Sequence, residues 1–223
     1  MRPLTDLTAK PLLEAGGRRL IEWQIAQLAR AGVRDIVINT AHFPDHFEAA
    51  LGDGARLGVS LVYSREGESA ADALETLGGI VRALPLLGSA PFIVASGDIV
   101  TDFDYARLQK VGAAMQAGSA DAHLVLVDNP PFHPRGDMAL VHGRVHPDGA
   151  DRLTYANIGM FAPRLFDSVP AGRARLFPWL YDAARAGRVS GERYEGRWRN
   201  VGTPHELAQL DGELRRGRSG RAP

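Results

Sequence analysis

The chain has 223 residues, of which 45% are hydrophobic, and a formal net charge of zero. That length suits one globular domain with a sizeable core, and the balanced charge disfavours nucleic acid or a membrane surface as a partner. No stretch approaches the roughly 18 apolar residues of a membrane span, and we expect a cytoplasmic protein. The absence of cysteine excludes disulfides, zinc–thiolate sites and thiol nucleophiles.

Strand-like and helix-like segments alternate through the first half of the chain. Ile21, Ile25 and Leu28 fall at helical spacing and predict a helix over 19–31, which Gly32 would end. In chain order, the sequence then predicts a strand over 35–39, a helix over 45–51, a strand over 59–63, a helix over 73–84 and a strand over 91–95. This alternation is typical of an α/β domain with a largely parallel sheet.

An aspartate follows the last strand predicted in this half. The apolar run 91–95 leads directly into Ser96, Gly97 and Asp98. Ligands of open α/β sheets bind at the carboxyl ends of the strands, so Asp98 is a candidate site residue. The alternative is that Asp98 only caps the following turn, which is a common role of aspartate.

The second half is more antiparallel in character. It predicts strands over 122–127, 138–145 and 152–161 and helices over 174–186 and 204–215, the last with Thr203 as its N-cap. We find no internal repeat and no linker. We therefore expect one domain over 1–214 and a disordered basic tail over 215–223.

Lysine is rare in this chain. Among 26 basic residues only Lys10 and Lys110 are lysines, so arginine serves nearly everywhere else. An ammonium is a compact charge suited to a phosphate oxygen in a tight site, which makes Lys10 a candidate phosphate ligand. Lys110 falls late in a helix-like stretch and is interpreted as a solvated surface residue.

Four stretches resemble the signature of the sugar-1-phosphate nucleotidyltransferase family. They are residues 2–12, residues 74–80, residues 96–98 with 102–108 behind them, and residues 198–203. The resemblance implies a Rossmann-like nucleotidyltransferase fold. In it, a largely parallel central sheet is flanked by helices, and a smaller antiparallel portion binds the sugar.

In that family an apolar strand and a glycine-rich loop come before the segment that matches residues 2–12. We therefore expect sequence ahead of Met1 to supply both in the full protein. A backbone N–H cradle holds the triphosphate in such loops. Without it we expect the chain to fold but to transfer nucleotides poorly.

The resemblance also implies the reaction and the role of each site residue. A sugar 1-phosphate attacks the α-phosphorus of a nucleoside triphosphate and releases pyrophosphate, so catalysis is mainly charge neutralisation and positioning. Mg²⁺ is the implied cofactor. The implied residues are Arg2 and Lys10 for catalysis, Asp98 and Asn200 for the metal, Glu75, Thr76, Gly78, Gly79, Ser96 and Gly97 for the nucleotide, and Asp137, Asn157 and Glu192 for the sugar.

Two positions depart from the family pattern. Asn200 stands where the family often has a second metal-binding aspartate, and its carbonyl brings no negative charge to a cation. Leu77 stands where a small residue is expected beside the base.

The implied partners are a nucleoside triphosphate and a sugar 1-phosphate, with UTP and N-acetylmuramate 1-phosphate preferred. Mannose or glucose 1-phosphate is the alternative acceptor, and a catalytically silent nucleotide-sugar-binding relative is the alternative class. The sequence leaves the oligomeric state open.

Overall fold

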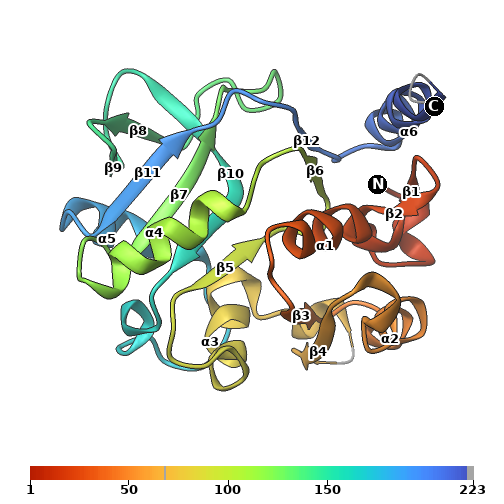
Figure 1. The fold of residues 1–223 in the computed structure, drawn as a ribbon, viewed down its shortest axis with the longest axis horizontal. Helices are drawn as coiled ribbons and strands as arrows, with labels where there is room; N and C mark the ends of the chain where they lie inside the picture. The colour runs from red at the N-terminus through yellow and green to blue at the C-terminus, as the bar shows by residue number, and fades with distance from the viewer. Residues whose placement is uncertain (68, 220–223) are drawn as a thin grey trace.

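The computed structural model describes residues 1–67 and 69–219 (Figure 1). The helices are α1 (Leu20–Arg30), α2 (Pro44–Leu51), α3 (Glu75–Leu87), α4 (Ala106–Gln116), α5 (Leu176–Arg185) and α6 (Pro204–Ser219). The strands are β1 (Glu14–Ala15), β2 (Arg18–Arg19), β3 (Asp35–Thr40), β4 (Ser60–Arg65), β5 (Phe92–Ala95), β6 (Ile99–Thr101), β7 (Ala122–Val127), β8 (Met138–Val141), β9 (Arg144–His146), β10 (Arg152–Phe161), β11 (Val189–Arg193) and β12 (Trp198–Asn200). Among these described residues, no helix is long and apolar enough to cross a membrane.

The main sheet has six strands in the order β5-β10-β7-β11-β9-β8. All six residues of β7 are buried, as expected of a central strand that is covered on both faces. On one face Leu124 and Leu126 pack with α3 and α5. On the other, Val125 packs with residues of α4. Burial on both faces fixes the position of the strands that lead to the site.

The sheet is not largely parallel, and that expectation is wrong. Among the described residues, the hydrogen-bonded pairs are antiparallel except β3–β4 and β7–β11. The reason lies in β10, a ten-residue strand that runs antiparallel between β5 and β7. The mixed α/β class itself is confirmed.

The strands β3 and β4 form a separate parallel pair. Their apolar side chains pack with those of α1 and α2. Figure 1 shows this pair, with α1 and α2, as one side of the molecule and the six-stranded sheet as the other.

An apolar slot separates β3 from β5. Its walls are residues 36–38 of β3 and residues 92–94 of β5, and the helices α1 and α3 also line it. The sheets of the described chain contain no hydrogen-bonded pairing between β3 and β5. Both strands end at the same polar cleft, through Asn39 and Ser96, so they run in the same direction. The slot thus lies between two open strand edges.

Two boundaries differ from the sequence predictions. The stretch 138–145 is not one strand, because His142 and Gly143 adopt φ of 48° and 74° and turn the chain between β8 and β9. The helix α6 extends through residues 215–219 of the predicted tail, whereas the rest of that tail, 220–223, lies outside the described residues.

The start of α6 is as predicted. Thr203 Oγ1 accepts a hydrogen bond from the Glu206 N–H at 3.1 Å, and Glu206 Oε2 accepts one from the Thr203 N–H at 2.8 Å. This reciprocal pair is a capping box, which satisfies backbone donors at the helix N-terminus.

Candidate functional site

A polar cleft, here called the strand-end cleft, lies at the carboxyl ends of β3 and β5. Its lining residues come from both sheets and from α3; they are Asn39, Glu66, Glu75, Thr76, Ile80, Val94, Ala95, Ser96, Tyr155 and Asn157. A neighbouring hollow contains Lys10 and shares Asn39 with the cleft. The structure therefore brings together Glu75, Thr76, Ser96 and Asn157 from the predicted nucleotide and sugar residues.

Two residues of the cleft have unusual backbone conformations. Glu75 has φ of 60° and Asn157 has φ of 55°, both in the left-handed region. Asn157 lies where the register of β10 against β7 shifts, and its carbonyl accepts the Ser96 N–H at 3.0 Å. Left-handed residues that are not glycine cost energy and cluster at ligand sites. Their presence in one cleft supports a functional role for it.

Lys10 and Asp98 form an ion pair beside the cleft. Lys10 Nζ lies 2.6 Å from Asp98 Oδ2, and about a quarter of each side chain is exposed. Lys10 begins a short 3-10 helix whose Leu12 is buried against α1. On the other side, Gly97 lets the chain pass close to Pro11, since a Cβ there would lie 3.2 Å from Pro11 Cβ. The predicted phosphate ligand and the predicted metal ligand thus meet.

Asn200 reaches the same region from the other end of the chain. The strand β12 pairs antiparallel with β6 and sets Asn200 opposite Ile99, and the Val201 N–H donates to the Asp98 carbonyl at 3.4 Å. Asp98 and Asn200 are hard oxygen donors, which is the chemistry that Mg²⁺ prefers. In the part of the chain that the structure describes, no group of three His, Asp or Glu could hold a metal. Asn200 itself lines another hollow, with residues 130–132, so the structure brings the two residues together through the backbone and leaves their joint role as metal ligands a proposal.

The two predicted nucleotide glycines face different neighbours. A Cβ on Gly78 would lie 2.2 Å from the carbonyl oxygen of Gly172, which is backbone. A Cβ on Gly79 would instead meet Glu66 Oε1 at 2.5 Å and Asn39 Nδ2 at 2.8 Å, both in the cleft. Glycine is therefore required at position 78 because backbone packs against it. At position 79 the absence of a side chain leaves room for Glu66 and Asn39 of the cleft.

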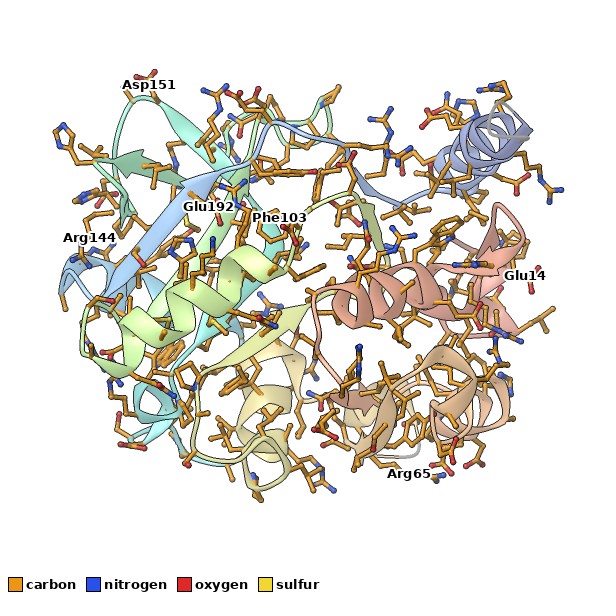
Figure 2. The ribbon with its side chains drawn as sticks, viewed as in Figure 1. Glu14, Arg65, Phe103, Arg144, Asp151 and Glu192 are labelled. Atoms are coloured by element: carbon orange, nitrogen blue, oxygen red, sulfur yellow. The ribbon has the colours of Figure 1, made fainter. Side chains whose placement is uncertain are left out.

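Two of the predicted residues lie away from the cleft. Glu192 lies on β11 (Figure 2). It forms an ion pair with Arg107 of α4, and its Oε1 lies 3.6 Å from His123 Nε2. Arg2 is largely exposed, and its Nε lies 3.2 Å from Asp6 Oδ1. Neither lines the strand-end cleft, so their predicted roles in the reaction gain no support from the geometry.

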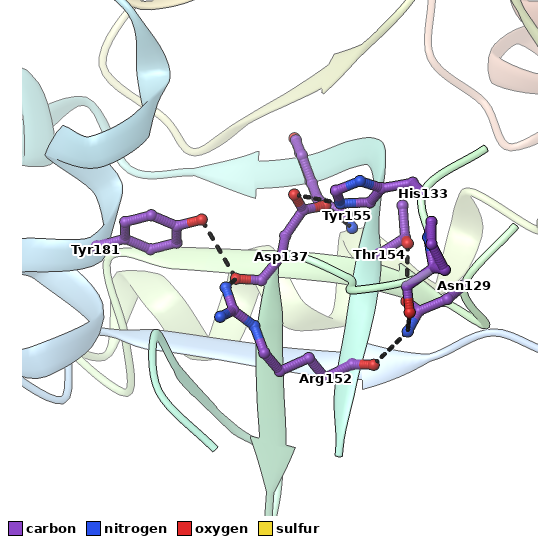
Figure 3. A network of polar contacts seen from close by, with 8 residues as sticks. Asn129, His133, Asp137, Arg152, Thr154, Tyr155 and Tyr181 are labelled. Carbon is purple, nitrogen blue, oxygen red and sulfur yellow. Dashed lines mark hydrogen bonds and ion pairs between the residues drawn. The ribbon is translucent and has the colours of Figure 1, made fainter. Parts of the chain in front are cut away.

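Asp137 is held in a polar network (Figure 3). Its Oδ1 lies 2.9 Å from His133 Nε2, and its Oδ2 accepts the Tyr155 N–H at 2.8 Å. Its carbonyl accepts hydrogen bonds from Arg152 and from the Tyr181 hydroxyl, the latter at 3.2 Å. With both carboxylate oxygens engaged, Asp137 fastens the loop before β8 to β10, directly beside Tyr155 of the cleft.

Sequence reasoning missed three polar residues of the cleft. Asn39 was assigned only as the end of a strand, although a polar side chain at a strand end is a usable signal. Glu66 lies in a loop without periodicity, where its Oε2 accepts the Leu74 N–H at 2.7 Å. Tyr155 is an interior residue of β10, and burial raises its pKa, so its phenol stays uncharged. Nothing in the sequence marked Glu66 or Tyr155.

The protein has an α/β fold with a polar cleft at the carboxyl ends of β3 and β5. Comparison with solved structures agrees on the fold. A putative glucose-1-phosphate thymidylyltransferase from Bacillus anthracis superposes with a TM-score of 0.78, 19% sequence identity, and coverage of 96% of this chain and 90% of that one. HddC from Yersinia pseudotuberculosis, complexed with GMP-PN, gives a TM-score of 0.73 at 15% identity, covering 92% of this chain and 89% of that one.

The chain belongs to the nucleotidyl transferase family, whose sequence pattern matches residues 1–138. It is 45% identical to an N-acetylmuramate alpha-1-phosphate uridylyltransferase of Neisseria meningitidis, over 94% of this chain and 90% of that protein. It is 35% identical to the enzyme of the same name from Caulobacter vibrioides, over 96% of this chain and 91% of that protein. A mannose-1-phosphate guanylyltransferase of Mycobacterium tuberculosis is 27% identical, over 97% of this chain and 62% of that protein.

Proposed function

We propose that the protein transfers UMP from UTP to N-acetylmuramate 1-phosphate, with release of pyrophosphate. The observation that carries the transfer chemistry is the Lys10–Asp98 pair beside the strand-end cleft. The choice of base and sugar rests on the two uridylyltransferases, which match nearly the whole chain. The product, a UDP-sugar acid, suits cell-wall recycling in the cytoplasm.

The reaction requires charge neutralisation more than covalent activation. An oxygen of the sugar phosphate bonds to the α-phosphorus while the bond to pyrophosphate breaks, and both reactants are anionic. The Lys10 ammonium neutralises phosphate charge as it passes to the leaving group. Asp98 and Asn200 would hold Mg²⁺, which when bound supplies further positive charge at the phosphates.

The cleft residues orient the two substrates. Glu75 and Thr76 begin α3 on one wall, and Ser96 and Asn157 lie on the other. Gly79 keeps the space between α3 and Asn39 free of a side chain. Orientation of this kind accounts for a large part of the rate in displacement reactions.

The proposal is tested by incubating the protein with UTP, Mg²⁺ and N-acetylmuramate 1-phosphate and measuring pyrophosphate and UDP-sugar. Parallel reactions contain glucose 1-phosphate with UTP, or mannose 1-phosphate with GTP. A second preparation carries an apolar strand and a glycine-rich loop ahead of Met1, because the slot between β3 and β5 offers apolar walls and open strand edges. UDP-sugar no higher than with Asp98→Ala, in both preparations, would exclude the proposed activity and leave the binding-protein alternative.

A further inference from the structure

Two arginines meet at one carboxylate on the rim of the strand-end cleft. Arg173 Nη2 lies 3.1 Å from Glu75 Oε1, and Arg175 Nε lies 3.9 Å from the same oxygen. Glu75 itself lines the cleft. Both arginine side chains are exposed, Arg175 to 79%, so they remain accessible from solution.

The backbone between these arginines is fixed to α3. The carbonyl of Ala174 accepts the N–H groups of Leu77 and Gly78, each at 3.1 Å, and the Ala174 N–H donates to Leu74 at 2.9 Å. The carbonyl of Gly172 lies so close to Gly78 that a Cβ there would be 2.2 Å away. The arginines are exposed at their tips but are carried by an anchored loop, which is what a recognition site requires.

The charge at this rim is not balanced. Within the described residues, Glu75 is the one carboxylate within 4 Å of either guanidinium, and it faces both. The other acid of the cleft, Glu66, also carries a negative charge, but its Oε2 accepts the Leu74 N–H rather than a guanidinium N–H. At the rim itself two guanidinium groups thus share one carboxylate, which leaves N–H donors for an incoming anion.

We propose that Arg173 and Arg175 bind a carboxylate carried by the sugar, and so select acidic sugar 1-phosphates over neutral ones. The inference rests on the proposed function and adds to it the feature of the sugar that is recognised. N-acetylmuramate bears a carboxylate on its lactyl ether, and N-acetylglucosamine is the same sugar without it. A guanidinium fork pairs with a carboxylate in a bidentate manner.

The position of the arginines separates this role from phosphate binding. Lys10 and Asp98 lie at the hollow on the other side of Asn39, and no residue of α3 lines that hollow. Glu75, with its two arginines, begins α3. With the phosphate at Lys10, the proposal places the acidic substituent of the sugar at this rim, so Glu75 serves the sugar side rather than the nucleotide to which the resemblance assigned it.

The test compares N-acetylmuramate 1-phosphate with N-acetylglucosamine 1-phosphate for the protein and its variants Arg173→Ala and Arg175→Ala. Losing a charge-assisted hydrogen bond should lower kcat/KM for the acidic sugar by about tenfold to a hundredfold. The value for the neutral sugar should change by less than about threefold. Arg173→Lys and Arg175→Lys keep the charge and should restore part of the loss.

Direct binding of each sugar phosphate, measured by calorimetry without UTP, should show the same selective loss. Arg185→Ala is the matched control, since Arg185 is an exposed arginine paired with Asp182 on α5 and lies outside the cleft lining. An equal loss for both sugars would show that the arginines bind the phosphate, and no loss for either would remove them from the site. Selective binding without UDP-sugar formation would contradict the proposed function alone.

Discussion

The ammonium of Lys10 lies 2.6 Å from Asp98 Oδ2 and joins a short N-terminal helix to the end of β5. The pair is only partly buried, so both charges stay within reach of an incoming phosphate. In the absence of substrate each group screens the other. When phosphates and a cation arrive, Lys10 can turn to an anionic oxygen and Asp98 to the metal.

Removal of either partner should therefore remove activity without unfolding the protein. We expect Lys10→Ala and Asp98→Ala each to lower turnover by about two orders of magnitude, because such groups contribute roughly 3 kcal/mol to the transition state. Pyrophosphate release under saturating substrates measures the effect. Lys110→Ala, in the other lysine of the chain, is the control and should retain full activity. Near-normal turnover in a folded Lys10→Ala protein would remove Lys10 from the site.

The neutral side chain of Asn200, which we propose as a metal ligand, predicts weak magnesium binding. Replacement Asn200→Asp adds a negative charge next to Asp98 and should lower the Mg²⁺ concentration for half-maximal activity by about tenfold. A magnesium titration of both proteins at fixed UTP gives this value. An unchanged midpoint would show that Asn200 does not contact the metal.

The two glycines at the start of α3 should respond differently to alanine. Gly78→Ala forces a Cβ against the Gly172 carbonyl and should lower the free energy of unfolding by about 1 to 3 kcal/mol. Gly79→Ala meets flexible side-chain ends, so it should cost less stability and instead weaken UTP binding by about tenfold. Urea unfolding and UTP titration measure the two quantities. The reverse pattern would contradict the division between packing and site.

Asp121 predicts an acid-sensitive element of stability outside the site. Burial by itself opposes ionisation of this carboxyl, but the hydrogen bonds and charges of Arg188 and Arg164 outweigh it and hold its pKa below the ordinary 3.8. The stabilisation is thus complete above the unfolded-state pKa of about 4 and is lost as the pH falls through the lower folded-state pKa.

Asp121→Asn should accordingly destabilise the protein by about 1 to 3 kcal/mol at pH 7, because two charge-assisted hydrogen bonds are weakened. The difference from the unchanged protein should shrink as the pH falls below about 4. Urea unfolding at several pH values measures it, with the exposed Asp151→Asn as control (Figure 2). A difference independent of pH would show that the charge of Asp121 is not responsible.

Elements specified by local sequence were predictable. The apolar run 122–127 is β7 with the same bounds, and Thr203 caps α6 as its hydroxyl and the following proline indicated. The resemblance singled out Lys10 and Asp98, because both sit in recognisable motifs, but it did not predict their contact with each other.

Features that depend on distant contacts were not predictable. The antiparallel insertion of β10 is decided by its pairing with β5 and β7, which no local pattern records. Position 78 requires glycine because the carbonyl of Gly172, far along the chain, lies against it. Glu192 was assigned to the sugar from its motif alone, whereas its strand faces α4 and Arg107.

The slot between β3 and β5 has a mechanical consequence. Because the two sheets share no ladder of hydrogen bonds across it, helix packing rather than backbone pairing sets their separation. Packed helices slide by small side-chain adjustments, whereas paired strands cannot shift without breaking hydrogen bonds. As long as the slot holds no further strand, the width of the strand-end cleft is therefore governed by α1 and α3, and amides on the slot edges of β3 and β5 should exchange with solvent hydrogen faster than those of β7.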